Sequence, residues 1–407
     1  MTEPSRPRTA PRQALFAGGG HDLPATFSAE PPPSRRRHVP RGVVFGVLGG
    51  VAVIATLSIA QLTANVGYDE AAEGFDDALW TARAHQTQTE HATAALIEKT
   101  DAGHVILDTG SPAIVVPDDA VAALASAVDD GEGAGAAAED VVATELPPSG
   151  DKPTWFWELY GATAELGAQQ QDLDRLVADL DDQTQNAQDT ARRVDETGTA
   201  VLKAAAAAAA PFEAAHISAR NDAVIALRRA AADAAAVASV DDSAATAYAA
   251  LQTAAGQVVA TEAEELAEKE GPLRAARIEI EAFARSLAPG VLLEFDWSPQ
   301  VNGAGFDGSM GGYTTWWWDD PGRATIELSN SVAEQWPAER SKALVAHEVG
   351  HAISVKCQGM YDASTQDSIE KWATAWAISM GFTDDANGVW AYGYPPQDYI
   401  DAAAGCR

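Results

Sequence analysis

The feature that most constrains this chain is an uncharged apolar run over residues 42–62, GVVFGVLGGVAVIATLSIAQL. A helix rises about 1.5 Å per residue, so about 20 residues match the hydrocarbon thickness of a bilayer. Four arginines, at positions 35–37 and 41, precede the run, whereas Asp69 and Glu70 follow it. Because basic flanks stay in the cytoplasm, the sequence predicts a single-pass plasma-membrane protein with a cytoplasmic N-terminus and an extracellular C-terminal part. A cleaved signal peptide is the alternative, which the 41-residue leader disfavours.

The charge of the chain changes sign at this run. Residues 1–41 carry seven Arg against two Glu and one Asp, whereas the whole chain has a net charge of −32. So acidic a surface repels phosphates, which argues against a nucleic-acid partner, and its simplest role is to keep an exported protein soluble. The tail is rich in Pro, Arg and Ser, without an apolar period, and is predicted to be disordered.

Helical periodicity continues after the apolar run, in the segment 63–129. Apolar side chains recur at three- and four-residue steps at Tyr68, Ala72, Phe75, Leu79 and Ala82. This spacing predicts an amphipathic helix that ends near Gly103. The next stretch, HVILDTGSPAIVVPDD, holds two β-branched runs around a turn signal and leaves a short hairpin open. Residues 130–152 are small and acidic, which predicts a linker.

A heptad repeat begins the region 153–288. Its seventh positions are Leu159, Leu166, Leu173, Leu180, Ala187, Val194 and Val201. This register predicts a long helix in a coiled-coil stalk, with an antiparallel partner after Pro211 or over about residues 241–270. A plain spacer or an oligomerisation device is the preferred interpretation, and a homo-oligomer through the coiled coil stays open.

The composition changes after Pro289, in the region 289–407. Three β-branched and aromatic stretches, at residues 291–297, 312–318 and 323–329, predict strands. Helices are predicted from Pro337 to about Val355, over 364–380 and near 396–404. Strands followed by helices make an α+β domain, here preceded by a long α-helical coiled-coil ectodomain and one transmembrane helix.

The chain has two cysteines, Cys357 and Cys406. Thiols outside the cytoplasm are usually oxidised, so the sequence predicts one disulfide between them, with a pair of free structural thiols as the alternative. The bond would tie the last residues to the segment just after the sequence HEVGH.

The sequence HEVGH at positions 347–351 is the strongest chemical signal in the chain. His347 and His351 are four residues apart, so on a helix they project from one face and can bind one zinc ion. Glu348 lies one position on, where it can polarise a water molecule without being a ligand. Small residues at Ala346 and Gly350 would let another element approach this helix closely.

A catalytic zinc needs a third protein ligand. No histidine follows His351, and Glu370 is the only later glutamate, early in the next predicted helix. Glu370 is therefore the predicted third ligand, with Asp367 and Asp362 as alternatives.

The pattern HEVGHAIS followed by EKWATAWA resembles the gluzincin branch of HExxH zinc metallopeptidases, over about residues 290–407. The resemblance implies a zincin-like fold, with His347, His351 and Glu370 as zinc ligands and Glu348 as the general base. Many such enzymes place an acidic residue four positions after the ligand glutamate, where this chain has Thr374. A hydroxyl or a backbone carbonyl would then have to orient the ligand histidine.

Peptide hydrolysis also needs a donor for the developing oxyanion. Tyr392, Tyr394 and Tyr399, in the C-terminal stretch WAYGYPPQDY, are the candidates. The strand RATIELS before the HEVGH helix has an edge-like alternation and is expected to bind a substrate backbone. The triplet at 316–318, three tryptophans, could line a groove, although packing is the simpler role.

These patterns predict a membrane-anchored zinc peptidase that acts on extracytoplasmic proteins or peptides. Water held between zinc and Glu348 would attack the scissile carbonyl, and Glu348 would pass the proton to the leaving amine. Two alternatives stay open. One is a non-enzymatic envelope protein in which the zincin-like domain is structural or docks a partner, which a fourth ligand such as Asp362 or Asp367 would favour. The other is a zinc hydrolase of cell-wall amide bonds.

Overall fold

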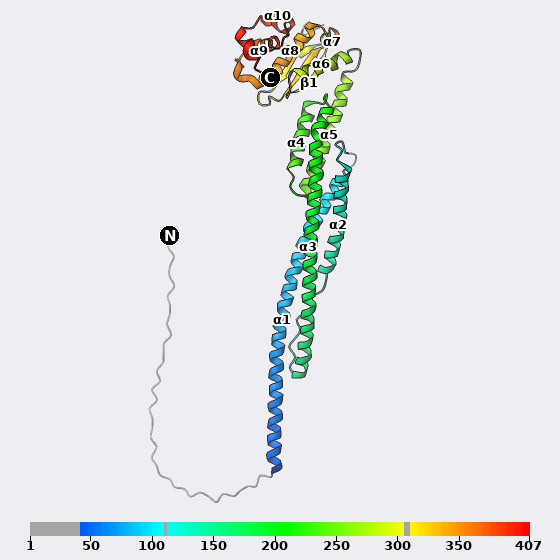
Figure 1. The fold of residues 1–407 in the computed structure, drawn as a ribbon, viewed down its shortest axis with the longest axis vertical. Coiled ribbons are helices and arrows are strands. Elements are labelled where there is room, and N and C mark those ends of the chain that lie inside the picture. The colour runs from blue at the N-terminus through cyan, green and yellow to red at the C-terminus, as the bar shows by residue number, and fades with distance from the viewer. Residues whose placement is uncertain (1–40, 110–111, 305–309) are drawn as a thin grey trace, which may run out of the picture.

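The chain forms a long helical stalk that carries a small head with a three-stranded sheet (Figure 1). The computed structural model describes residues 41–109, 112–304 and 310–407, with side chains from residue 50 on. The N-terminal tail predicted to be disordered lies outside the described residues. The mostly helical architecture with a small C-terminal sheet agrees with the sequence prediction.

The apolar run and the amphipathic segment after it form one continuous helix of 67 residues, α1 (Arg41–Leu107). From Gly50 on, α1 is long and apolar enough to cross a membrane, and only 6% of its apolar window is buried. Farther along, the predicted stripe is buried at Tyr68, Phe75, Leu79 and Ala82. The helix ends one turn beyond the predicted end at Gly103.

The hairpin left open after α1 does not form in the described residues 108–109 and 112–117, which contain no strand. The side-chain amide of Gln252 accepts from the backbone N–H of Ile114 at 3.0 Å and donates to its carbonyl at 3.1 Å. The backbone of Ile114 is therefore satisfied by one side chain rather than by a second strand, while its own side chain is buried in the stalk.

The linker prediction over 130–152 is wrong in its first half, where α2 (Asp118–Val142) continues. The small residues are contact points between helices. A Cβ at Gly131 would lie 2.3 Å from Thr100 Cγ2, and a Cβ at Gly103 would lie 2.6 Å from Val128 Cγ2. Glycine thus lets α2 pack closely against α1, and only the stretch from 143 to 155 connects α2 to the next helix.

The heptad region forms α3 (Phe156–Ala215), and six of its seven heptad positions are buried, with Leu166 partly exposed. The predicted antiparallel partner is wrong for most of its length, because α3 runs parallel to α1 (Figure 1). Hydrogen bonds along the stalk join residues of α1 to residues that lie 93–97 positions later in the chain. They run from the pair Gln61 and Thr154 to the pair Lys99 and Asp195. The heptads of α3 show which face of this helix is buried, but they do not identify α1 as the helix that covers it.

The two predicted partners, α4 (Asn221–Ala236) and α5 (Asp242–Glu268), pack against the upper end of α3 (Figure 1). Pro211 lies inside the last turns of α3 rather than after them. The upper stalk therefore has the larger hydrophobic core, and the lower stalk has three small clusters.

The head contains the three predicted strands, β1 (Leu292–Ser298), β2 (Gly312–Trp316) and β3 (Arg323–Ser329). Their order is β1-β3-β2, with β1 parallel and β2 antiparallel to β3. Helices α7 (Asn330–Glu334), α8 (Glu339–Ser354), α9 (Gln366–Ser379), α10 (Val389–Tyr392) and α11 (Gln397–Ala403) follow.

Helix α6 (Arg274–Leu287) corrects the predicted end of the stalk at residue 288. Its side chains Ile280 and Ala284 are fully buried in the same core as Phe295, Trp372 and Trp376 of the head. The apolar face of α6 covers the sheet and α8, so this helix belongs to the head.

Candidate metal centre

The two histidines lie on α8, which begins after Ala338 and buries most of its second half. His347 and His351 are 6% and 4% exposed, and they face the same side because they are four residues apart. Buried polar side-chain atoms usually have a hydrogen-bond partner, so the ring nitrogens of both imidazoles are expected to meet one.

That partner comes from α9, whose first turn is capped by the Thr365 hydroxyl, which accepts from the backbone N–H of Ser368 at 3.3 Å. Trp372 and Trp376 bury one face of α9 and fix its rotation. Glu370 then projects toward α8. The close packing depends on Gly350, where a Cβ would lie 2.8 Å from the carbonyl oxygen of Ala373. The predicted close approach at Gly350 is confirmed.

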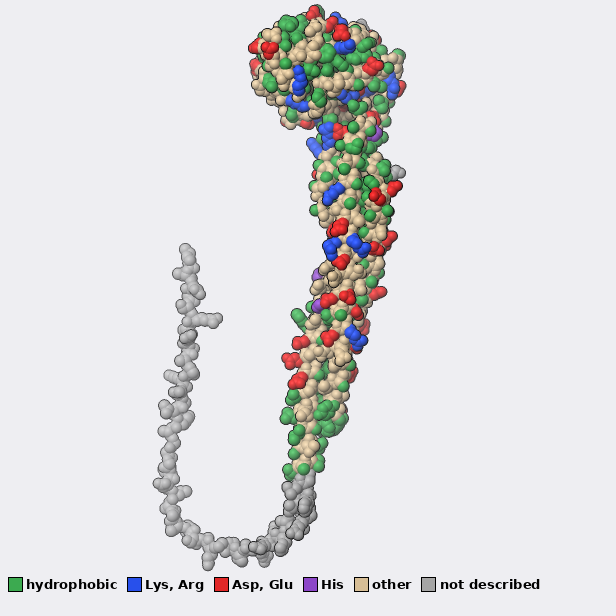
Figure 2. All heavy atoms as spheres, in the orientation of Figure 1, with side chains coloured by type: hydrophobic (Ala, Val, Ile, Leu, Met, Phe, Trp, Pro, Cys, Tyr) green, Lys and Arg blue, Asp and Glu red, His purple; other side chains and the backbone are tan. Residues whose placement is uncertain are grey.

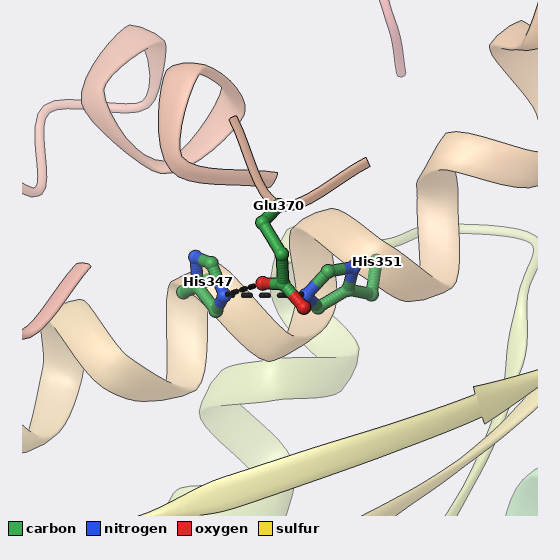
Figure 3. A group of neighbouring side chains, drawn as sticks. All are labelled: His347, His351 and Glu370. Atoms are coloured by element: carbon green, nitrogen blue, oxygen red, sulfur yellow. Dashed lines mark hydrogen bonds and ion pairs between the residues drawn. The ribbon is translucent and has the colours of Figure 1, made fainter. Parts of the chain in front are cut away.

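The three side chains converge on one point (Figure 3). Glu370 Oε2 lies 3.2 Å from His347 Nε2 and 3.2 Å from His351 Nε2, and the two Nε2 atoms are 3.2 Å apart. The Glu370 side chain is 12% exposed. Burial raises the pKa of Glu370, but hydrogen bonds with the two imidazoles outweigh it, so the pKa of Glu370 is lowered.

These distances fit a tetrahedral metal ion. Zinc binds imidazole nitrogen and carboxylate oxygen at about 2.0–2.2 Å, and the edges of such a tetrahedron are about 3.3 Å long. The triangle of 3.2 Å sides therefore has the dimensions of one face of a zinc site. No fourth His, Cys, Asp or Glu joins the three within the described part of the chain. Two nitrogens and one carboxylate also match the donor set of catalytic zinc sites.

His347 is oriented from behind by Thr374 and Gly388. Thr374 Oγ1 lies 3.4 Å from His347 Nδ1 and donates to the carbonyl of Glu370 at 2.9 Å, which leaves it to accept from the imidazole. The hydroxyl occupies the position where the gluzincin pattern has an acidic residue, and its contact with Nδ1 turns Nε2 of His347 toward Glu370. Gly388 has φ +103°, and a Cβ there would lie 2.3 Å from Thr374 Oγ1 and 2.7 Å from His347 Nδ1.

His351 is held by an aromatic ring instead. Trp316, the last residue of β2, stacks on it with the ring centroids 5.3 Å apart and the planes 4° from parallel. His351 Nδ1 is buried without a hydrogen-bond partner among the residues that the structure describes. Stacking therefore fixes the plane of this ring, whereas a hydrogen bond fixes that of His347.

The side chains of His347, His351 and Glu370 are called the metal group below. Glu348 lies beside this group and does not belong to it. Thr314 Oγ1 is 2.7 Å from Glu348 Oε2 and 3.1 Å from the Glu348 carbonyl oxygen. Burial raises the pKa of Glu348, while His347 and the Thr314 hydroxyl partly offset this. Strand β2 approaches so closely that a Cβ at Gly312 would lie 2.6 Å from Glu348 Cγ. A carboxylate with a raised pKa is suited to accepting and returning a proton.

Two hollows of about 380 and 430 Å³ meet at the metal group. Both are lined by Met310, Gly312, His347, Glu348 and Tyr392. One extends past Arg340, Leu344 and Trp390, and the other past Trp316, Trp318 and Ile369. Together they make a cleft beside β2, in which His347 and Glu348 line both hollows, whereas His351 and Glu370 line only the second.

The cleft corrects the predicted substrate edge. The strand RATIELS, β3, is the central strand and pairs on both sides. The edge strand beside the cleft is β2, which pairs only with β3 among the described strands. An alternating pattern indicates one buried face of a strand, and it does not tell an edge strand from a central one.

The candidate tyrosines have three different environments. Tyr392 lines both hollows, and its ring lies parallel to that of His347 with centroids 6.0 Å apart. Burial, with the nearby Glu370 and Glu348 carboxylates, raises the pKa of Tyr392 to about 12, so its hydroxyl stays protonated. Tyr394 is 68% exposed and lines neither hollow. Tyr399 bonds to Ser368 at 2.9 Å and packs on Trp372.

The alternative acids lie elsewhere. Asp362 bonds to the Ser364 hydroxyl and backbone, and Asp367 pairs with Lys371 at 2.8 Å.

The predicted disulfide between Cys357 and Cys406 is confirmed, and it joins the chain just after α8 to the C-terminus. Trp376 Nε1 also donates to the Cys406 carbonyl at 2.9 Å, so the tail braces α9 behind Glu370.

Sequence reasoning did not identify Thr314, Gly312 or Gly388 as part of the site. Their only local signal was the position of Gly312 and Thr314 on a predicted strand, since each contributes through a contact with a distant residue. The tryptophan triplet was assigned mainly to packing, whereas Trp316 and Trp318 line the cleft. No protein-family model, curated protein or solved structure matches this chain.

Proposed function

We propose that the head is a zinc-dependent peptidase, held outside the cell by a membrane-anchored stalk. One observation carries the proposal: two imidazoles and a carboxylate form one face of a zinc-sized tetrahedron inside a cleft, next to the buried carboxylate of Glu348. A structural zinc would be closed by a fourth protein ligand, and none joins the group in the described residues.

His347, His351 and Glu370 would hold the ion. Zinc bound there supplies a Lewis acid and makes a water molecule acidic near neutral pH. Glu348 accepts a proton from the attacking water and passes it to the leaving amine. Thr314 holds the Glu348 carboxylate through its 2.7 Å hydrogen bond, so that Oε1 remains for the water.

The cleft favours an extended peptide as substrate. The outer edge of β2 has backbone N–H and C=O groups that pair with no other described strand, and it lies beside the metal group, which suits strand addition by a peptide backbone. Such binding would present successive side chains to the two hollows and a scissile carbonyl to the ion between them. This backbone recognition favours peptides over the amide bonds of the cell wall.

Tyr392 is the proposed oxyanion donor. It is the one candidate tyrosine that lines both hollows of the cleft, and its raised pKa keeps the proton on the hydroxyl. A donor placed where charge develops stabilises the transition state more than the substrate. Tyr394 and Tyr399 have no such position.

The long apolar helix is proposed to cross the plasma membrane with the basic N-terminal tail in the cytoplasm. The disulfide supports an oxidising compartment for the head. The stalk would then hold the cleft away from the bilayer, where extracytoplasmic proteins are within reach.

The test uses the full chain loaded with zinc and a mixed peptide library. Glu348→Gln should keep one zinc per chain and lower turnover by at least about 100-fold, because the proton acceptor is lost. Glu370→Gln should lower zinc affinity itself by at least about 100-fold, since loss of a ligand exceeds the loss of its supporting partner. Glu339→Gln, an exposed position of the same helix paired with Lys342, is the control and should change neither.

Equal turnover in Glu348→Gln and the parent would contradict the mechanism, and full zinc binding by Glu370→Gln would contradict the ligand set. If the unsubstituted chain binds zinc but cleaves no peptide of the library, even when extra zinc is added, the non-enzymatic alternative would be favoured.

A further inference from the structure

An exposed aromatic group lies at the lower end of the stalk. The sequence TWFWELY spans the start of α3, and Trp155, Trp157 and Tyr160 are 55%, 57% and 52% exposed. The two indoles stack with centroids 5.3 Å apart. Soluble proteins rarely leave a cluster of large aromatic side chains in water, so this surface requires a partner.

The group lies level with the end of the apolar run of α1. Gln61 binds the backbone here twice, donating to the Thr154 carbonyl at 3.0 Å and accepting from the Phe156 N–H at 3.0 Å. One turn on, Thr63 and Tyr160 share a hydrogen bond of 3.2 Å. These contacts fix the aromatic group beside residue 62, where the run ends.

The packing beneath the group makes this placement rigid. Leu159 and Phe156 turn inward onto Ala64 and Tyr68 of α1, so the neighbouring side chains of α3 turn outward. Leu62 and Val66 of α1, 65% and 50% exposed, add further apolar side chains at this level of the stalk. Figure 2 shows hydrophobic side chains gathered at this lower end of the stalk.

We infer that Trp155, Trp157 and Tyr160 form an anchor that binds the outer interface of the lipid bilayer crossed by α1. Trp and Tyr are enriched at this depth, because an apolar ring can enter the acyl boundary while its N–H or O–H stays with the headgroups. The group is continuous with the apolar helix, and a run of about 20 residues ends at the outer edge of the hydrocarbon. A protein partner would not explain why the aromatics stand level with that edge.

The anchor gives the stalk two membrane contacts instead of one. A single helix leaving a bilayer can tilt freely, whereas a second contact on α3 resists tilting of the parallel pair. The chain reaches this position only because residues 143–155 return along α1 before α3 begins, and Lys152 bonds to Asp69 at 2.6 Å on the way. Since α3 then rises for 60 residues, or about 90 Å, the anchor sets the height of the cleft above the membrane.

The inference rests on the proposed membrane-spanning role of α1, and its test uses tryptophan fluorescence. The chain has no Trp before Trp80, so the membrane-spanning run contributes no signal. The full chain is placed in phospholipid vesicles whose lipids carry bromine near the headgroup, and quenching is compared with that in unbrominated vesicles. The expected result is clear quenching in the parent.

Trp155→Ser/Trp157→Ser should lose most of this quenching. Trp80→Ser is the matched control, because Trp80 is 73% exposed on the same stalk and lies about 27 Å farther along α1 than residue 62. Its removal should leave the quenching unchanged. Far-UV circular dichroism checks that both variants keep the helical content of the parent.

Several results would overturn the anchor. One is equal quenching in the parent and the double variant; another is a parent that floats with vesicles yet shows no quenching. Indoles buried against a second copy would show blue-shifted emission that brominated lipid does not change. A chain that fails to float with vesicles would remove both the anchor and the proposed membrane span. Peptide turnover is measured separately, so failure of the peptidase proposal leaves this result intact.

Discussion

The stalk and the head bury their side chains in different ways. In the lower stalk the core is divided into small clusters such as Phe75, Leu79, Ala82 and Leu173, each between two or three helices. In the head one continuous core surrounds Trp372 and Trp376 and takes in the sheet and five helices, α6, α7, α8, α9 and α11. Alanine and glycine allow close helix contacts but bury little area, so the stalk gains stability by length and the head by bulk.

This difference predicts which substitutions and changes of length each region can tolerate. In a stalk built of successive small clusters, a substitution is expected to destabilise its own cluster and the adjacent clusters, and to have little effect farther along the helices. The metal group depends on contacts among two helices, a strand and a loop, so it depends on the whole head core. A stalk can lengthen or shorten without altering the cleft, whereas the head cannot be altered piecemeal.

The two regions are joined by a buried ionic network. Lys269 lies 3.2 Å from Glu265 and 3.4 Å from Glu281, and all three side chains are at most 3% exposed. Glu281, on α6, also pairs with Arg285 at 3.3 Å and accepts from Trp297 Nε1 at 3.0 Å. The carboxylate of Glu281 thus links stalk helix α5 to the head sheet.

The largest expected effect is at this junction. Glu281→Gln leaves Lys269 and Arg285 buried with one fewer negative charge, which should lower the free energy of unfolding by about 3–5 kcal/mol. Tryptophan emission follows mainly the head, which holds eight of the eleven tryptophans, and far-UV circular dichroism follows mainly the long helices of the stalk during urea unfolding. Both transitions should shift if the network couples the two regions.

Glu279→Gln is the matched control, two residues away on α6, where the carboxylate only accepts from Trp336 Nε1 near the surface. It should change stability by less than about 1 kcal/mol. Equal effects of the two substitutions would show that the junction is not a coupling element.

The disulfide should affect the head alone. Replacing both Cys357 and Cys406 by Ser removes a link across 49 residues and should lower head stability by about 2–4 kcal/mol, because the unfolded chain gains freedom. The tryptophan transition in urea measures this loss, and the stalk signal should stay in place. A parallel shift of the stalk transition would contradict the division into two differently stabilised regions.

Substitution of two glycines of the head can distinguish the effect of backbone strain from the effect of a displaced histidine ligand. Gly388→Ala and Gly393→Ala both place a side chain at positive φ, +103° and +81°, and each should cost about 1–3 kcal/mol. Only at Gly388 does the added Cβ meet Thr374 and His347, since Gly393 has open space around it. Gly388→Ala should therefore also weaken zinc binding by at least about 10-fold.

Competition with a coloured zinc chelator measures this difference between the two variants. Identical zinc affinities would mean that the loop behind His347 does not orient the ligand.

The smallest effect is expected in the stalk. Thr89 and Thr184 share a buried hydrogen bond of 2.9 Å between α1 and α3, and Thr89 also donates to the His85 carbonyl at 2.9 Å. Thr184→Val keeps the shape and removes one bond, so it should cost about 0.5–1.5 kcal/mol in the stalk transition. Head stability and zinc affinity should not change, and a shift in either would show that the stalk core supports the cleft directly.

Much of the chain was predictable from local spacing. The stripe from Tyr68 to Ala82 and the heptads of α3 are repeats that identify a helix and its buried face, and the apolar run identifies a helix by its length and composition. The three strands were predicted for the same reason, from β-branched runs bounded by turn residues. Local spacing failed at residues 130–142, where glycine was taken as a linker signal and is a contact between helices.

The amino-acid sequence alone determined which side chains can meet in the site, because a spacing of four residues on a helix brings His347 and His351 to one face and only one glutamate follows them. Tertiary structure decided that Glu370 reaches both rings, that Tyr392 rather than Tyr394 lies in the cleft, and that β2 is the edge strand. It also decided that α3 pairs with α1 in parallel. Periodicity defines which face of an element is buried, but the partner of that face is chosen by packing between residues far apart in the chain.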